Sequence, residues 1–230
     1  MLPDNPLILC IDTSLETANL SLNRGYEVLE RRVGMEQKQQ VSFLHPAIKL
    51  MLETVGVSIN KVDCIAVIYG PGSYTGLRVG LSTAKGLCLA LGIPLVVINT
   101  LELLSLTAIN TLGKVFELYC PMIDARRMEV FTALYDKHLL SVMPTRAIIL
   151  GQGEFKDELE KGEIVFFGNG SIKYKDIQQH KNAHFEIIPY SAECMAKIAC
   201  DKYRSGQVAD LSYVQPLYVK EFYSNIEAIK

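Results

Sequence analysis

The chain has 230 residues, of which 49% are hydrophobic and 21% charged, so it is a globular protein with enough length for one large domain or two small ones. Its 23 lysines and arginines against 25 aspartates and glutamates give a net charge of −2, which disfavours direct, high-affinity binding of nucleic acid. The six cysteines form no Cys-x-x-Cys pair, and no apolar run is long enough for a signal peptide or a membrane span, so we expect a soluble, cytoplasmic protein with reduced, buried cysteines.

The chain begins with a predicted three-strand meander. Its strands cover Leu7–Asp12, 18–22 and Glu27–Val33, and Asn23-Arg24-Gly25 forms the turn between the last two. A helix is predicted next, over Gln40–Val55, because apolar residues recur there on one face.

Residues 62–99 are predicted to form a β-α-β unit. An apolar run over 62–69 indicates a buried strand, and 77–91 contains no proline and indicates a helix, which Ser73 or Thr75 could cap. A strand over Leu95–Asn99 completes the unit, so the first half has the order βββαβαβ and a partly parallel sheet.

Three glycines, Gly70, Gly72 and Gly76, lie between this strand and this helix. Their spacing is one residue too long for the dinucleotide-binding fingerprint, and no Gly-Lys-Ser/Thr follows them as in a Walker loop. Two interpretations remain open. The unpaired N–H groups at the helix start could bind an anion, or the glycines could serve only a tight turn and close packing.

The second half begins like the first, with a strand that ends in an aspartate, a turn and a second strand. Its elements are strands over 115–123 and 128–135, a short apolar run over 139–142, a polar segment with a possible short helix over 151–161, a strand ending in glycines over 164–170, and a helix over Ala192–Arg204. No linker separates the two halves.

An aspartate ends the first predicted strand of each half. Asp12 stands in Ile-Asp-Thr-Ser and Asp124 in Ile-Asp-Ala-Arg, each before a turn and a second strand. At the carboxyl end of a strand, either carboxylate could hold a metal-phosphate or polarise a water, and either could equally stabilise a turn. Arg126 and Arg127 could clamp an anion, or Arg126 could pair with a neighbouring carboxylate.

Histidines give no support for a metal site. His180 and His184 have the spacing of a zinc-binding helix, but Lys181 stands where the metalloprotease motif needs its glutamate, and the segment is polar throughout. Ser73 has no histidine and acid at motif spacing, so a Ser-His-Asp hydrolase is not expected.

The two predicted helices of the first half carry more apolar surface than one sheet face can cover. We therefore expect a helix-helix dimerisation surface. The alternative is that these helices cover only each other and the sheet. The residues predicted for the surface are Phe43, Ala47 and Leu50 on the first helix and Arg78, Lys85 and Leu89 on the second.

Three stretches of the chain carry a specific resemblance: IDTS at 11–14, YGPGSYTGLRVGLSTAKGLCLALGIPLVVINTLELL at 69–104, and IDARRMEVFTALY at 123–135. They closely resemble the bacterial tRNA threonylcarbamoyladenosine biosynthesis protein TsaB family. The match is strong over residues 7–136 and weaker afterwards, at GNG (168–170) and VQPLYVKEF (214–222).

This resemblance implies an α/β fold of the actin-like ATPase (ASKHA) type with two related lobes. The first lobe is expected at residues 1–108, with the dimerisation helices, and a reduced second lobe at 109–230. In the catalytic paralogue TsaD, the strand after the glycine-loop helix runs into Asn-His-x-x-x-His, whose histidines bind the active-site metal. Here Asn99 is followed by Thr100, and Leu104 occupies the second histidine position. Leucine cannot bind a metal and threonine does so only weakly, so we expect no metal site.

The function implied by the resemblance is that of a non-catalytic subunit. It would pair with TsaD, with the ATPase TsaE as a third partner, in the complex that transfers a threonylcarbamoyl group to the tRNA adenosine next to the anticodon. Self-pairing would be its resting form, tRNA would be reached through the complex, and no cofactor is expected, with ATP or ADP only as weak ligands.

The main rival interpretation is an enzyme of the same fold, a nucleotide-binding phosphotransferase or ATPase. A metallo-glycopeptidase is the weakest interpretation, because the histidines are missing. The phosphate or nucleotide site of the rival enzyme would be made by Asp12, Gly70, Gly72, Asp124, Gly168 and Gly170.

Overall fold

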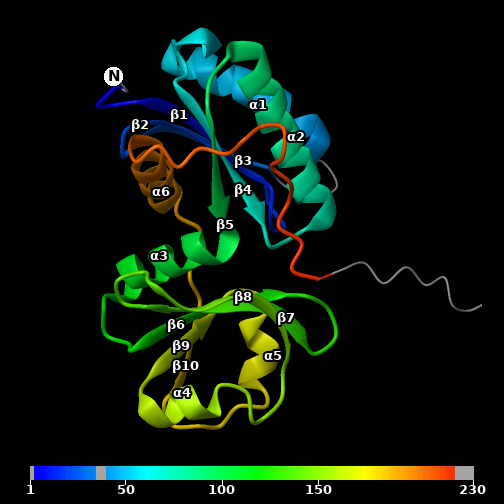
Figure 1. The fold of residues 1–230 in the computed structure, drawn as a ribbon, viewed down its shortest axis with the longest axis vertical. Helices are drawn as coiled ribbons and strands as arrows, with labels where there is room; N and C mark the ends of the chain where they lie inside the picture. The colour runs from blue at the N-terminus through cyan, green and yellow to red at the C-terminus, as the bar shows by residue number, and fades with distance from the viewer. Residues whose placement is uncertain (1–2, 35–39, 221–230) are drawn as a thin grey trace, which may run out of the picture.

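A computed structural model describes residues 3–34 and 40–220 and contains two five-stranded sheets, one above the other (Figure 1). The first sheet has the order β3-β2-β1-β4-β5 and the second the order β10-β9-β6-β7-β8. The strands of the first sheet are β1 (Leu7–Asp12), β2 (Asn19–Arg24), β3 (Glu27–Val33), β4 (Cys64–Gly70) and β5 (Leu95–Asn99). Those of the second are β6 (Leu118–Asp124), β7 (Glu129–Asp136), β8 (Ser141–Ile149), β9 (Ile164–Phe167) and β10 (Ala183–Glu186).

The two sheets have the same connectivity. In each, the first strand pairs antiparallel with the second and parallel with the fourth, and in the described ranges each half has the order βββαβαβα. The helices of the first half are α1 (Gln40–Val55), α2 (Tyr74–Leu91) and α3 (Thr100–Leu112), with a short 3-10 turn η2 (Ile59–Lys61). Those of the second are α4 (Lys156–Lys161), α5 (Ser171–Lys175) and α6 (Ala192–Arg204). The predicted reduction of the second half is visible in the short helices α4 and α5.

Most predicted elements are confirmed, whereas α3, the short elements η2 and α5, and the strand β10 were not predicted. The bounds of β1, β3, α1, β5 and α6 agree with the prediction. Helix α3 was missed because it is buried almost all round, so it lacks the amphipathic period that identifies a surface helix. Its local signals are present, since the Asn99 side chain accepts a hydrogen bond from the Leu101 N–H at 2.8 Å and Gly113 ends the helix.

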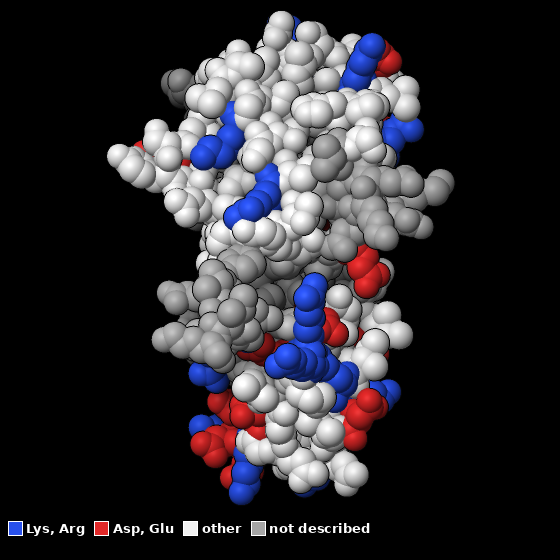
Figure 2. Space-filling model, turned by 90° about the vertical axis from the view of Figure 1, so that its right-hand side faces the viewer, with Lys and Arg blue, Asp and Glu red and all other residues white. Residues whose placement is uncertain are grey.

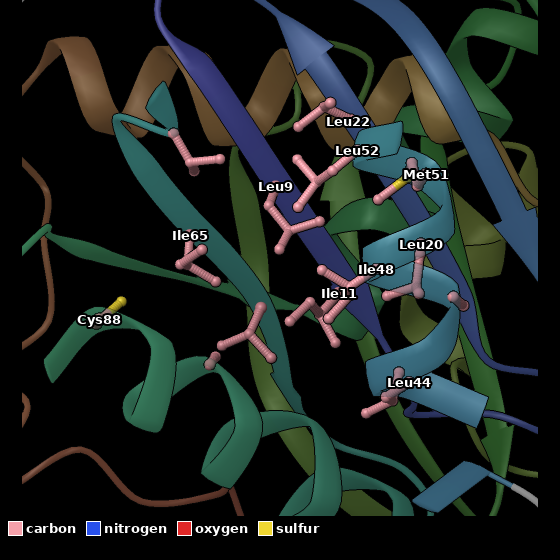
Figure 3. Packing of buried hydrophobic residues seen from close by; sticks show 14 of the residues in the cluster. Leu9, Ile11, Leu20, Leu22, Leu44, Ile48, Met51, Leu52, Ile65 and Cys88 are labelled. Carbon is pink, nitrogen blue, oxygen red and sulfur yellow. The ribbon is translucent and has the colours of Figure 1, made fainter. Parts of the chain in front are cut away.

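The core of the first sheet lies on both of its faces. Helices α1 and α2 cover one face, where Leu44, Ile48 and Met51 point from α1 toward Leu9 and Ile11 of β1 (Figure 3). Burying these side chains removes apolar surface from water at roughly 25 cal/mol per Å². Helix α6 covers the opposite face.

Helices α3 and α6 connect the two halves, because α3 packs on both sheets, with Leu103 and Leu106 on the first, and α6 packs on the first. Helix α3 follows the last strand of the first sheet, yet Leu101 and Leu104 pack against Tyr119 and Val165 of the second. Helix α6 follows the last strand of the second sheet, yet Met195 packs on the first. The division into lobes at residues 108 and 109 stays a prediction, and α6 lies on the first sheet although it falls within the predicted second lobe.

The cysteines and histidines of the described residues are placed as follows. All six cysteines are free and buried, as predicted. His184 lies in strand β10 and not on a helix, so the spacing to His180 does not align the two rings on a helix face. Within the described part of the chain, no cluster of three or more His, Cys, Asp or Glu side chains could hold a metal ion. None of the described helices combines the length and apolar character needed to cross a bilayer.

Candidate functional site

A cleft of about 740 Å³ lies between the two sheets, at the level where β1 and β6 end. One wall is made by the loop after β1 and the start of α2. The other is made by the β6–β7 turn, β7 and the loop after β9. Ser14, Gly72, Tyr74, Asp124, Arg126 and Asn169 are among the lining residues.

The two strand-end aspartates play the same local role in both halves. The Asp12 Oδ1 atom accepts a hydrogen bond from the Ser14 N–H at 2.8 Å, and the Asp124 Oδ1 atom accepts one from the Arg126 N–H at 2.6 Å. Each carboxylate therefore closes a turn of the chain at the end of its strand, as an Asx turn does. Turn stabilisation was one of the two predicted roles, and a ligand role for either aspartate stays a prediction.

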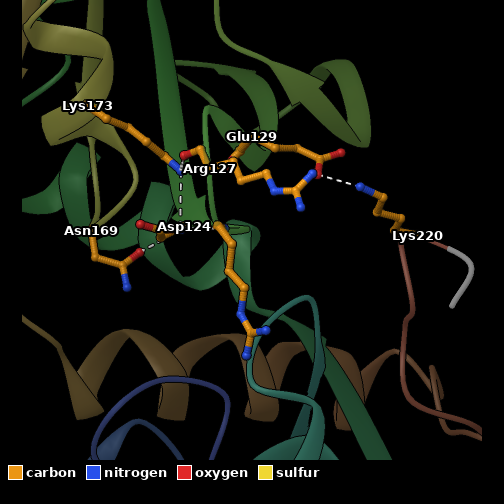
Figure 4. A network of polar contacts seen from close by, with 7 residues as sticks. Asp124, Arg127, Glu129, Asn169, Lys173 and Lys220 are labelled. Carbon is orange, nitrogen blue, oxygen red and sulfur yellow. Dashed lines mark hydrogen bonds and ion pairs between the residues drawn. The ribbon is translucent and has the colours of Figure 1, made fainter. Parts of the chain in front are cut away.

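The surroundings of these two carboxylates differ. Asp12 is 2% exposed, and burial raises its pKa although the Ser14 hydroxyl and N–H both bond it. Partial burial also acts to raise the pKa of Asp124, but the Arg126 N–H and the Lys173 ammonium, at 3.1 Å, outweigh it and lower that pKa. Figure 4 shows the Asp124 carboxylate between Lys173 and Asn169.

Replacing the two aspartates by asparagine is expected to change stability in opposite directions. The pKa of Asp12 is raised in the folded state, so the neutral side chain favours folding. This contribution of Asp12 to the free energy of unfolding is fully present below its unfolded pKa of about 3.9 and is lost as pH rises through the folded pKa. Asp12→Asn keeps the acceptor for Ser14 without a buried charge, so it should be more stable than wild type at pH 7, and the difference should vanish toward pH 4.

Asp124→Asn is the matched control in this pair. Its lowered pKa stabilises the fold above the unfolded value, and that contribution is lost as pH falls through the folded pKa, so this variant should be less stable than wild type at pH 7. Urea unfolding of both variants at pH 7 and pH 4 measures the effect. Equal or lower stability of Asp12→Asn at pH 7 would contradict the prediction.

The predicted glycines are placed where other backbone comes too close for a side chain. Gly72 has a φ of +157°, and a Cβ there would meet the Ser14 carbonyl oxygen. Gly70, with a φ of +131°, has the Leu217 carbonyl oxygen 2.8 Å from the position of a Cβ. A Cβ at Gly170 would lie 2.9 Å from the Ile123 carbonyl carbon. The structure thus supplies the packing role that was one of the two interpretations.

The predicted phosphate-site residues do not all meet in the cleft. Gly72 and Asp124 line it, whereas Asp12, Gly70, Gly168 and Gly170 are not among its lining residues. The start of α2 is capped by Ser73, whose hydroxyl accepts from the Gly76 N–H at 3.2 Å, so one of the two predicted caps is confirmed. Sequence reasoning did not identify Asn169, whose side chain accepts from the Asp124 N–H at 2.9 Å.

Thr100 and Leu104, which replace the metal-binding histidines of the paralogue, are both buried. The Thr100 hydroxyl donates to the Pro71 carbonyl oxygen at 2.6 Å, and Leu104 is 8% exposed in the core of the second sheet. The hydroxyl therefore fixes the glycine loop to the start of α3. That this chain binds no metal here stays a prediction.

The predicted helix surface is partly exposed and partly internal. Leu50 on α1 is 49% exposed and Leu89 on α2 is 70% exposed. Ala47 is buried and Phe43 is half-buried against the core, so they contribute little free surface. Between the helices lies a groove of about 310 Å³ lined by His45, Ser82, Thr83, Gly86 and Leu87. Dimerisation through this face stays a prediction.

A C-terminal strap, defined as residues 205–220, covers the other flank of α2 and was not predicted. Its orange-to-red ribbon runs from α6 past β5 to α2 and down to the level between the sheets (Figure 1). Lys85 on α2 donates to the Val214 carbonyl oxygen at 3.3 Å, and the Arg78 Nε atom donates to the Tyr218 hydroxyl at 2.8 Å. The strap reaches the second sheet through Lys220, whose ammonium lies 2.6 Å from a Glu129 carboxylate oxygen.

Comparison with known proteins assigns the family. Residues 35–153, just over half of the chain, match the family model described as "TsaD: tRNA N6-adenosine threonylcarbamoyltransferase". A Bacillus subtilis protein named tRNA threonylcarbamoyladenosine biosynthesis protein TsaB is 31% identical over 175 residues, which are 74% of each chain. The chain belongs to the TsaB family. The TsaB protein of Escherichia coli is 28% identical over 227 residues, which are 93% of this chain and 94% of that protein.

A solved structure also has a fold similar to that of this chain. YeaZ from Pseudomonas aeruginosa has a TM-score of 0.75 and 23% sequence identity, and the match covers 93% of this chain and 99% of that one. With the repeated connectivity of the two sheets, this likeness confirms the predicted ASKHA fold for this TsaB-family chain.

Proposed function

We propose that this TsaB-family chain takes part in tRNA threonylcarbamoyladenosine modification as a non-catalytic subunit. The TsaB relatives and the match to the TsaD family model support the pathway. One observation carries the subunit role, namely that the polar groups a catalytic or nucleotide site would need are bonded within the chain. Asp12 holds Ser14, Asp124 holds Lys173, and Thr100 holds Pro71.

The exposed leucines of α1 and α2 support a role in assembly. Leu50 and Leu89 place apolar surface on the outer side of two helices whose inner sides are already packed on the first sheet. Exposed apolar groups of this kind, next to a groove, are typical of an interaction surface. In the proposed complex this surface pairs with TsaD and, in the resting form, with a second copy of this chain. TsaE joins as a further partner, and the transfer chemistry belongs to TsaD.

The proposal is tested by reconstitution of the modification with purified TsaD, TsaE, threonylcarbamoyl-adenylate as the group donor, ATP and a tRNA transcript. We expect threonylcarbamoyladenosine, measured by mass spectrometry, to fall to background when this chain is omitted. The variants Asp12→Asn and Asp124→Asn should restore it as well as wild type does. Full modification without the chain would overturn the subunit role.

The same assay separates the subunit from the rival enzyme. If this chain used its cleft as an ATPase or phosphotransferase, removing either carboxylate would abolish the activity of the mixture although the variants remain folded. The urea unfolding described above establishes that they are folded.

A further inference from the structure

The turn between β6 and β7 presents two arginines in an unusual backbone conformation. Arg126 has a φ of +70° and Arg127 a φ of +48°, a left-handed region that costs roughly 1 kcal/mol or more for a residue with a side chain. Two consecutive residues of this kind persist only where their surroundings hold them. The contacts around the turn show what holds it.

Lys173 on α5 fixes the turn from beneath. Its ammonium is bonded to the Asp124 Oδ1 atom at 3.1 Å, to the Arg127 carbonyl oxygen at 2.7 Å and to the Glu129 carbonyl oxygen at 2.6 Å (Figure 4). These three bonds use the three donors of the ammonium group. The Lys173 ammonium therefore stabilises the conformation of the turn and has no donor left for a ligand.

The two guanidinium groups are left without a counter-charge. The Asp124 carboxylate is bonded to Lys173, and the Glu129 carboxylate is bonded to Lys220 at 2.6 Å. Within residues 3–34 and 40–220, no carboxylate lies within ion-pair distance of Arg126 or Arg127, and both arginines are exposed. A rigid turn that presents two unneutralised guanidinium groups suits phosphate, which arginine binds through two parallel N–H donors.

The opposite lip of the cleft offers aromatic rings and a third arginine. Tyr74, which lines the cleft, and Tyr218 of the strap are 36% and 38% exposed, with ring centroids 5.3 Å apart. The Arg78 guanidinium lies over the Tyr74 ring, 3.8 Å from its centroid. Figure 2 shows a group of lysine and arginine side chains just below mid-height of the face in view, with acidic side chains beside it and further basic side chains above.

Partly exposed rings near two arginines that form no ion pair are typical of surfaces that bind single-stranded or looped RNA, where arginines hold phosphates and rings contact bases. We infer that the Arg126–Arg127 turn contacts phosphates of the tRNA, with Tyr74 and Tyr218 beside it, so that the overall charge of −2 conceals a local RNA-binding surface. The inference rests on the proposed function, because it assigns the tRNA a contact on this chain as well as on its partner.

The test compares binding of a fluorescent tRNA transcript to complexes of TsaD with wild-type or variant chain, by fluorescence anisotropy over a range of salt concentrations. For Arg126→Ala with Arg127→Ala we expect the dissociation constant to rise about tenfold or more and the log-log salt slope to fall by about 1.4 to 1.8, because each phosphate contact contributes about 0.7 to 0.9. The conservative variant Arg126→Lys with Arg127→Lys should retain most of the affinity, because the charge is kept.

The matched control is Arg24→Ala with Lys161→Ala, which removes the same charge from the exposed ends of β2 and α4. An equal loss of tRNA affinity in this control would show that the effect depends only on the overall charge of the chain, and it would overturn the inference. So would unchanged tRNA affinity in the arginine variant, displacement of the tRNA by ATP, or a loss of TsaD binding by calorimetry in place of tRNA binding.

Failure of this inference can be distinguished from failure of the proposed function. If omission of the chain leaves modification intact, the proposed function fails whatever the salt slope. If the chain is required but the arginine variant binds tRNA as wild type does, only the RNA contact fails.

Discussion

Leu89→Glu is expected to abolish association of this chain with itself and with TsaD. Leu89 is 70% exposed on α2, beside the groove between α1 and α2, so a glutamate there leaves the fold intact but must lose its water when a partner covers it. Burying an unpaired carboxylate costs several kcal/mol, and a loss of about 3 kcal/mol weakens an affinity more than 100-fold. Leu50→Glu, on the facing side of α1, should act in the same way.

Light scattering gives the mass of the isolated chain, and calorimetry gives its affinity for TsaD. Ile172→Glu is the matched control, because Ile172 is 69% exposed on α5, which lies on the second sheet, away from α1 and α2 (Figure 1). If Leu89→Glu and Ile172→Glu associate equally well with TsaD, the helix surface is not the interface and the assembly role has to be placed elsewhere on the molecule.

Gly168→Ala is expected to destabilise the fold by about 3 to 5 kcal/mol, the range of exceptional single substitutions. Gly168 has a φ of +92°, and a Cβ there would press against the Met122 carbonyl oxygen of the central strand β6. That oxygen already accepts the Gly170 N–H at 3.0 Å, so it cannot move aside without breaking the loop that carries Asn169. Both the conformational and the steric penalty therefore fall on one residue.

Gly92→Ala separates these two penalties. Gly92 ends α2 with a φ of +65°, but nothing lies within 4 Å of the position of its Cβ. This variant should lose only about 1 kcal/mol, the conformational part. Urea unfolding measures both variants. Equal losses would show that the contact with Met122 is relieved by a small shift and that Gly168 is not required for packing.

The sequence was sufficient to predict the order of the elements from β1 to β5 apart from the short turn η2, because each of them carries its own local signal. The strand β1 is a continuous apolar run, α1 has a regular apolar face, and α2 begins at Ser73 and ends at Gly92. Helix α3 escaped because its surroundings, two sheets and α6, bury nearly all of its sides. Its amphipathic pattern was lost for a tertiary reason that no window of sequence contains.

The candidate site was only partly predictable. The aspartates were found from their position after a strand, but the preference between turn and ligand depended on contacts with Ser14 and Lys173, the second of which lies 49 residues away in the sequence. The position of the strap on α2 could not be predicted for the same reason, because the hydrogen bond between Arg78 and Tyr218 joins residues 140 positions apart in the sequence. Such distant pairings depend on the finished fold and leave no periodic trace in the chain.

The packing of α3 between the two sheets and of α6 on the first sheet has a consequence for how the molecule could be divided. A chain cut after residue 112 would leave one fragment whose first sheet lacks the helix α6 and another whose second sheet lacks the helix α3. Each fragment would expose to solvent a large apolar surface that includes residues such as Ile98 or Tyr119. Each half therefore depends on a helix from the other to cover its sheet, and neither half is expected to fold as an independent domain.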